Sequence, residues 1–349
     1  MPPQLAALLA NWSGIEATRG GIDRTASDYV ARRVRELELR SPEQYLELLT
    51  GPTCPEFQSL MDSITVTYTW FFRDSPQLSA IMQLLRDTPA HGGPLQVWVA
   101  GCATGEDVYS IAIASEELSR PVEVLGTDVN SRALDRARSG RYSAFSLREL
   151  PERFTGYFRR VAPDDWLIDA SLRKAVRFET RNLVGPPALP TTGSAWDLIL
   201  CRNVLIYFVR EQAHTVFETL ARSLRPAGHL MVGSSEIVFS LPPELEPVYV
   251  AETRLPACVR VQASRTAASQ TKITDSERVS RSLARTATGA AQQRRRRGAA
   301  RRPSNRRART GRRAPGAALL ARPRTRPARP RRTGGGPRAV SRRSGIGAQ

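Results

Sequence analysis

LQVWVAGCATGEDVYSIAI, residues 95–113, is the stretch that decides the fold of this chain. It opens with alternating apolar residues around Trp98, which predict a short buried strand. The strand runs into a turn of small residues, 100–105, which is followed by Glu106 and Asp107 at the start of an apolar helical segment. A strand, a small-residue turn and an acidic helix start predict the first unit of a nucleotide-binding α/β sheet, in which the ligand lies against bare backbone.

A second predicted strand, 121–126, leads into Asp128. An acid about 20 residues after the turn, at the tip of the second strand, is placed to accept hydrogen bonds from both hydroxyls of a ribose. The glycines spell neither GxGxxG nor a GxxxxGKS/T phosphate loop, so a ligand with a pyrophosphate is not favoured. We therefore expect S-adenosylmethionine, which carries a ribose and an amino-acid tail, with Glu106 near its ammonium group.

Two further predicted strands, 176–179 and 196–201, are each followed by polar residues. These are Asn182 after the first strand, and Arg202, Asn203 and Tyr207 after the second. The ligand crevice of an open α/β sheet lies beyond the carboxyl ends of its strands, so we expect these residues there. Asn182 is compatible with an adenine contact or an ordinary turn, and Tyr207 with a substrate contact or packing.

The segment SITVTYTWFFRD, residues 63–74, places an aromatic cluster beside one arginine, Arg73. A core helix needs the aromatic residues alone, because a buried guanidinium requires a partner. We therefore predict a functional role for Arg73.

Residues 1–88 are expected to form a helical domain of their own. Ser27 and Asp28 predict the cap of a helix over 29–39. This helix carries a run of arginines that is compatible with a solvated face or with a docking surface for an acidic partner. The arginines are Arg32, Arg33 and Arg35.

The net charge of +19 is concentrated at the end of the 349-residue chain. Residues 263–349 contain 24 arginines and one lysine against Asp275 and Glu277, so the rest of the chain is mildly acidic. This Arg-rich tail has almost no aromatic residues, and its composition predicts disorder. It is compatible with binding polyanions through counterion release, with tethering, with an inert extension and with a reading-frame artefact.

The composition excludes several classes of protein. Four single cysteines without a CxxC pair argue against a zinc site or a disulfide framework and suit a reducing cytosol. No apolar run reaches the roughly 18 residues of a membrane span, and the first residues do not resemble a secretory signal. We expect a cytoplasmic monomer that binds no metal and is not inserted in a membrane.

Four stretches together resemble the CheR-type chemotaxis receptor methyltransferases, which are S-adenosylmethionine-dependent protein-glutamate O-methyltransferases. They are TYTWFFRD (67–74), AGCATGEDVYSIA (100–112), GTDVNSRALDRARSGRY (126–142) and CRNVLIYF…LRPAGHLMVGSSE (201–236). The resemblance extends over about residues 10–262 in unbroken order. It implies an all-helical N-terminal domain over 1–88 and a class I methyltransferase domain over 89–262. The latter would have a Rossmann-like sheet and a small β-subdomain, with the tail at 263–349.

The resemblance also implies roles for residues that match its motifs. The cofactor site would be lined by Arg73, Glu106, Asp128, Asn182, Leu183, Arg202 and Asn203, together with Thr67 and Thr69. Arg73 and Tyr207 would flank the reacting methyl group, and the arginines of the N-terminal helix would engage the methylated helices of a receptor. Thr67 stands where the family usually has Asn, which removes an amide from the pocket. Residues 165–180 look too short for the longer β-subdomain loop of family members that dock a receptor's C-terminal pentapeptide.

The expected activity is transfer of a methyl group from S-adenosylmethionine to glutamate side chains of chemotaxis receptors in sensory adaptation. Two alternatives stay open: a non-catalytic signalling adaptor that binds the cofactor, and a nucleic-acid methyltransferase that uses the tail. Amino-methylating enzymes of the latter class carry an Asp/Asn/Ser-Pro-Pro-Tyr/Phe loop after the fourth strand. Here that position is occupied by 201–204, Cys-Arg-Asn-Val, which disfavours this alternative.

Overall fold

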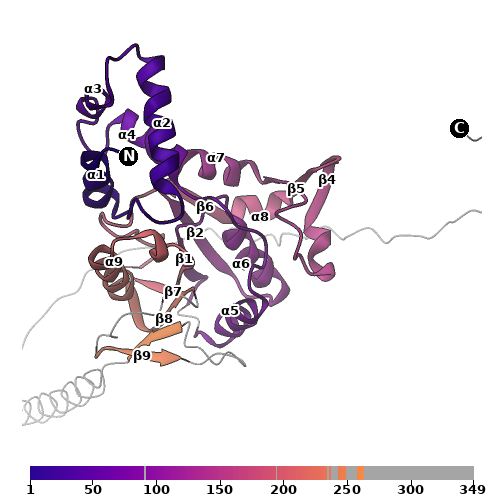
Figure 1. The fold of residues 1–349 in the computed structure, drawn as a ribbon. Helices are drawn as coiled ribbons and strands as arrows, with labels where there is room; N and C mark the ends of the chain where they lie inside the picture. The colour runs from indigo at the N-terminus through magenta and orange to yellow at the C-terminus, as the bar shows by residue number, and fades with distance from the viewer. Residues whose placement is uncertain (90–91, 194, 234–235, 237–242, 249–257, 263–349) are drawn as a thin grey trace, which may run out of the picture. The chain divides into compact units, whose positions relative to one another are not determined.

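The computed structural model describes residues 1–89, 92–193, 195–233, 236, 243–248 and 258–262 (Figure 1). The predicted disorder of the tail, 263–349, lies outside these residues. The predicted domain boundaries near residues 88 and 262 stay predictions.

A mostly parallel seven-stranded sheet forms the centre of the described chain. In spatial order its strands are β6 (Val176–Thr180), β2 (Val122–Asp128), β1 (Leu95–Ala100), β7 (Trp196–Cys201), β8 (Leu224–Val232), β10 (Cys258–Val261) and β9 (Leu245–Val248). The first five are parallel, and β10 pairs antiparallel with both β8 and β9. The order reverses between β1 and β7, where an α/β sheet forms its ligand crevice. The predicted α/β class is confirmed.

Helices cover both faces of the sheet. The side chains of β1 alternate between the two faces and pack against helices on each. Val97 and Val99 belong to one core cluster, which includes residues of α5 (Ser75–Asp87), α6 (Glu106–Glu117) and α8 (Ala170–Ala175). Trp98 and Ala100 belong to another, which includes residues of α9 (Arg210–Arg222). Burial of every residue of β1 explains why its sequence is nearly all apolar.

The first four helices of the chain share a core of their own. They are α1 (Pro3–Ser13), α2 (Ile22–Glu36), α3 (Pro42–Glu47) and α4 (Pro55–Ile64). The predicted cap at Ser27 and Asp28 is wrong, since α2 begins directly after Gly21, which has a φ of 74°. The Ser27 hydroxyl instead donates to the carbonyl of Asp23 inside the helix, an alternative use of a serine that sequence alone does not distinguish from a cap.

The segment between β2 and β6 first forms α7 (Ser131–Ser139), capped by Asn130 and ended by Gly140. An antiparallel sheet of three strands follows in the order β3 (Arg141–Tyr142), β5 (Asp165–Ile168) and β4 (Phe158–Ala162). The 3-10 helix η1 (Glu152–Tyr157) leads into β4. This small sheet agrees with the expected β-subdomain and lies beside α7 and α8 (Figure 1).

None of the described helices combines the length and the apolar character that crossing a membrane requires.

Candidate active site

A cavity of about 930 Å³, counted with the solvent at its mouth, lies beyond the carboxyl ends of β1, β2, β6 and β7. The sheet contributes Gly101, Asp128 and Asn203, and the N-terminal helices contribute Ser13 and Ile22. The ligand space is therefore shared between the sheet and the helices that precede it.

All the predicted site residues except Thr67 and Glu106 line this cavity. Thr67 is exposed outside it. Glu106 is buried, and its carboxylate accepts hydrogen bonds from the hydroxyls of Thr104 (2.5 Å) and Ser146 (2.9 Å). Burial raises the pKa of Glu106, against these hydrogen bonds, which lower it. Its predicted contact with the cofactor's ammonium group stays a prediction.

Glycine is required in the turn after β1. Gly101 has a φ of 73°, and a Cβ there would clash with the side chain of Val204. The backbone N–H groups of Gly101 and Cys102 both donate to the carbonyl of Thr127, at 2.8 and 2.9 Å. The turn is thus fixed by two hydrogen bonds to β2 and packs against the loop that follows β7.

Asp128 lies at the end of β2 and is held by backbone donors. One carboxylate oxygen accepts from the N–H of Ala103 and the other from the N–H of Asn130, each at 2.8 Å. Each oxygen keeps a second lone pair for a ligand hydroxyl. Burial raises the pKa of Asp128, while the two backbone hydrogen bonds favour its charged form.

Arg202 is buried and fully engaged with the protein. Its guanidinium donates to Oε1 of Gln77 (2.5 Å), to both oxygens of Asp107 (3.0 and 3.2 Å) and to the carbonyl of Arg73 (2.7 Å). Arg202 therefore forms an ion pair with Asp107, which also lines the cavity, and holds the backbone that carries Arg73. Sequence reasoning missed Gln77 and Asp107 as its partners.

The guanidinium of Arg73 has no carboxylate within ion-pair distance among the described residues. It donates only a long hydrogen bond to the carbonyl of Tyr68 (3.4 Å) and lies 4.6 Å from the ring centre of Trp70. Its neighbours Phe72 and Asp74 have φ values of 56° and 70°, in the left-handed region. Such strained backbone clusters at functional sites, which agrees with a functional role for Arg73.

The loop after β7 is organised by Glu236, which sequence reasoning did not single out. Its buried carboxylate accepts from four backbone N–H groups: Asn203 (2.7 Å), Val204 (2.7 Å), Ile206 (3.4 Å) and Gly233 (2.6 Å). A lone acid four residues after the end of β8 was the available signal, because a buried carboxylate needs several donors.

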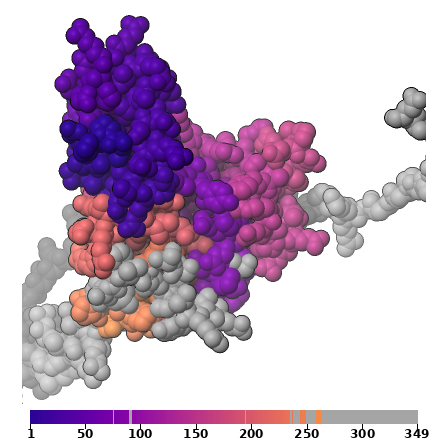
Figure 2. Space-filling view, in the orientation of Figure 1, coloured from indigo at the N-terminus to yellow at the C-terminus, as the bar shows by residue number. Residues whose placement is uncertain are grey.

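Tyr207 is held by the chain between α1 and α2. Its carbonyl accepts from the N–H of Glu16 (2.8 Å), and a Cβ on Gly20 would lie 2.8 Å from its ring. Ile15 and Phe208 form an antiparallel bridge beside it. The space-filling view shows the N-terminal helices directly against this part of the chain (Figure 2).

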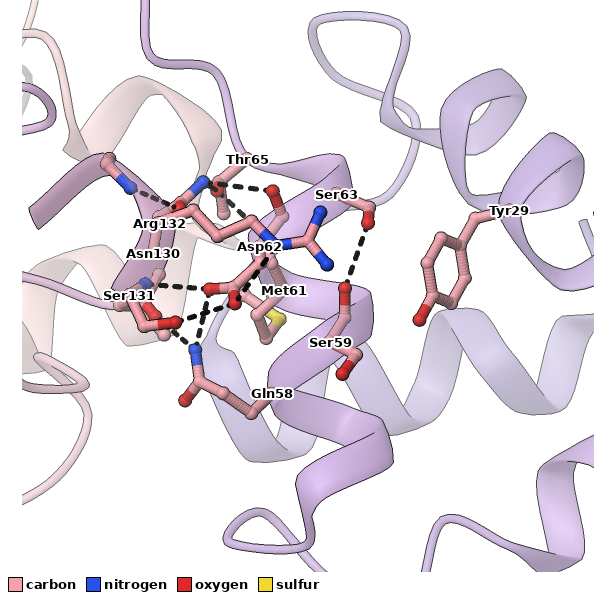
Figure 3. A network of polar contacts seen from close by, with 12 residues as sticks. Tyr29, Gln58, Ser59, Met61, Asp62, Ser63, Thr65, Asn130, Ser131 and Arg132 are labelled. Atoms are coloured by element: carbon pink, nitrogen blue, oxygen red, sulfur yellow. Dashed lines mark hydrogen bonds and ion pairs between the residues drawn. The ribbon is translucent and has the colours of Figure 1, made fainter. Parts of the chain in front are cut away.

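Asp62 joins the N-terminal helices to the end of the cavity at Asp128 (Figure 3). Its carboxylate accepts from the N–H (2.7 Å) and the hydroxyl (2.6 Å) of Ser131, at the start of α7. The side-chain amide of Asn130 donates to the hydroxyl of Thr65 (2.8 Å). Since the backbone N–H of Asn130 donates to Asp128, this network links α4 to the residue that is predicted to bind the ribose.

The side chain of Asn182 makes one hydrogen bond within a turn and another to a distant helix. Its side-chain oxygen accepts from the N–H of Val184 (3.1 Å), and its amide donates to the carbonyl of Trp12 in α1 (2.5 Å). The adenine contact predicted for Asn182 stays a prediction.

The part of the chain that the structure describes contains no group of three or more His, Cys, Asp or Glu side chains that is arranged to hold a metal ion.

Comparison with known proteins identifies the family. Residues 67–252 match the family model for the CheR methyltransferase SAM-binding domain. Chemotaxis protein methyltransferase 1 of Pseudomonas aeruginosa is 30% identical over 204 residues, which cover 55% of this chain and 73% of that protein. A chemotaxis protein methyltransferase of Listeria monocytogenes is 35% identical over 194 residues, covering 53% and 70%.

A third relative, the probable biofilm formation methyltransferase WspC of P. aeruginosa, is 33% identical over 265 residues, which cover 72% of this chain and 60% of that protein. The family match spans the strained segment around Arg73, the turn after β1 and the loop after β7. The chain is an S-adenosylmethionine-dependent methyltransferase and belongs to the CheR family.

Proposed function

We propose that this enzyme methylates glutamate side-chain carboxylates of chemotaxis receptors and forms glutamate methyl esters. The names of its relatives and the family of its catalytic domain support this substrate class. The observation that carries the proposal is which of the arginines that line the cavity form an ion pair within the protein. Arg202 and Arg181 are paired with acids, whereas Arg73 has no such partner among the described residues and is available to an incoming carboxylate.

The cavity residues fit S-adenosylmethionine. Asp128 offers acceptors for ribose hydroxyls, and apolar side chains that include Ile15 and Leu183 suit an adenine ring. When bound, S-adenosylmethionine supplies a methyl group on a sulfonium, which is also its leaving group.

In the proposed mechanism the protein aligns a nucleophile that is already charged. An unperturbed glutamate side chain has a pKa of about 4.3 and needs no general base at neutral pH. Arg73 and Tyr207 would orient its carboxylate, and such alignment contributes on the order of 7–11 kcal/mol. A loose contact with Arg73 suits this role, because tight binding of the carboxylate would stabilise the ground state as well.

We propose that the receptor docks on α2, and the three arginines expected there differ in availability. Arg33 donates to both oxygens of Glu56 at 2.9 Å, and these hydrogen bonds raise its pKa. Its side chain is 24% exposed, against 52% for Arg32, whose ion pair with Glu36 is longer, at 3.6 Å. Arg35 is exposed. Arg32 and Arg35 are therefore the better candidates for contact with an acidic receptor.

We also propose that the protein works as a monomer in the cytoplasm. Its four cysteines are free, which suits a reducing compartment. Light scattering of the purified chain tests the oligomeric state, and fractionation of cells that express it tests the compartment.

The test of the function is incubation of the purified chain with methyl-labelled S-adenosylmethionine and membranes that contain candidate receptors. We expect label on receptor bands that mild base releases as methanol, as carboxyl methyl esters require. The Arg73→Ala variant should bind the cofactor but label the receptor far more slowly. Absence of label with every receptor, despite measurable cofactor binding, would favour the non-catalytic adaptor.

A further inference from the structure

Three aromatic side chains and one arginine form a surface beside the cavity. We call Tyr68, Trp70, Phe145 and Arg148 the rim platform. Tyr68 is 58% and Phe145 46% exposed, which is unusual for large apolar side chains. Their rings contact one another, with centres 5.2 Å apart, and Tyr68 also meets Trp70 edge-on at 5.6 Å.

Arg148 lies over this group of rings. The centre of its guanidinium is 3.6 Å from the ring centre of Trp70 and 3.8 Å from that of Phe145. A hydrogen bond from its Nη1 to the carbonyl of Phe145 (2.6 Å) ties it to the backbone. No described carboxylate lies within ion-pair distance of it. A stacked guanidinium keeps N–H groups at its edge, and those of Arg148 that do not bind Phe145 are available to a carboxylate.

The rim platform is continuous with the cavity. Tyr68 lines the cavity itself, and Trp70 carries Arg148 at 3.6 Å and the cavity residue Arg73 at 4.6 Å. The guanidinium groups of Arg73 and Arg148, which have no ion-pair partner among the described residues, thus contact the same indole ring. A polypeptide that presents a carboxylate to Arg73 would bring its neighbouring side chains to Arg148.

The base of the platform is rigid. The N–H of Phe71 donates to the carbonyl of Ser146 at 2.9 Å and so ties together the two segments that supply the platform. Phe71 is fully buried between the rings of Tyr142 and Phe158, each 4.8 Å away. A rigid base orders the site before the substrate arrives and lowers the entropic cost of binding.

We propose that the rim platform binds a second acidic side chain of the substrate, close to the glutamate that is methylated. This inference rests on the proposed function and names a local feature of its substrate: a segment with neighbouring carboxylates on one face. The alternative partner of an aromatic and arginine surface is single-stranded nucleic acid, whose bases stack on open ring faces. Arg148 already occupies the faces of Trp70 and Phe145, which favours the acidic segment.

The test is a double-mutant cycle, in which an enzyme variant and a substrate variant are measured singly and together. The substrates are the cytoplasmic domain of a receptor that the wild-type enzyme labels, and the same domain with the acids that neighbour each methylated glutamate changed to Gln. Arg148→Gln in the full chain should lower kcat/KM about fivefold on the first substrate, the effect of a well-formed exposed ion pair. It should have little effect on the second and should leave the dissociation constant for S-adenosylmethionine unchanged.

Arg153→Gln is the matched control, because Arg153 is also exposed and lies over an aromatic ring, Phe154, at 4.6 Å, away from the cavity lining. The inference is overturned if Arg148→Gln affects both substrates equally or no more than Arg153→Gln does. It is also overturned if Arg148→Gln leaves both kcat/KM values unchanged and weakens binding of a fluorescent single-stranded RNA. A wild-type enzyme that labels no receptor contradicts the proposed function instead.

Discussion

Glu236 should be essential to the loop that follows β7. Its Oε2 accepts from the N–H groups of Asn203 and Gly233, and its Oε1 from those of Val204 and Ile206. The Glu236→Gln variant keeps the size of the side chain but replaces one acceptor oxygen with an amide that donates. Two buried N–H groups then lose their acceptor and face another donor.

The magnitude follows from these contacts. A hydrogen bond to a charged group contributes about 1.5–3 kcal/mol, so the loss of two predicts a free energy of unfolding lower by about 3–6 kcal/mol. Urea unfolding, followed by tryptophan fluorescence, measures it. Calorimetry with S-adenosylhomocysteine should also show weaker binding, because Asn203 and Val204 line the cavity.

The matched control is Glu246→Gln. Glu246 pairs with Arg260 at the surface, with side chains 37% and 45% exposed, so its loss should cost less than about 1 kcal/mol. If Glu236→Gln unfolds with the same free energy as Glu246→Gln, the reasoning about the buried carboxylate is refuted.

Three further predictions concern residues that line the cavity or lie beside it. Tyr207→Phe should lower turnover with little change in the calorimetric affinity for S-adenosylmethionine, and a large loss of affinity would remove Tyr207 from the chemistry. Asp128→Asn should weaken cofactor binding by about tenfold or more, the effect of losing one charge-assisted hydrogen bond to a ribose hydroxyl; unchanged binding would contradict the ribose assignment. Burial raises the pKa of Glu106, so the stability that this group contributes is present below its ordinary pKa and is lost as the pH rises through the raised value. The free energy of unfolding of Glu106→Gln, relative to that of the wild type, should therefore increase as the pH rises above the ordinary glutamate pKa of about 4.3, and parallel curves would show that the folded-state pKa is not raised.

Local patterns determined the central sheet and most of the residues around the cavity. The alternation around Trp98, the glycine turn and the position of Asp128 follow from interactions close in the chain, so sequence alone predicted them. Parallel strands bring their carboxyl ends to one edge, which is why Arg202 and Asn203 line the cavity together with Asp128. The predicted roles of these residues in binding stay predictions.

Only the tertiary structure decided how the site is held together. Glu236 accepts hydrogen bonds from residues about 30 positions away, Asp62 binds Ser131, and Arg202 pairs with Asp107, which is 95 positions away. Sequence patterns record which residue types recur at a helical or strand spacing, but they do not record which distant donor meets a buried carboxylate. Such patterns also do not show that Glu106 lies buried against Thr104 and Ser146 while its neighbour Asp107 lines the cavity.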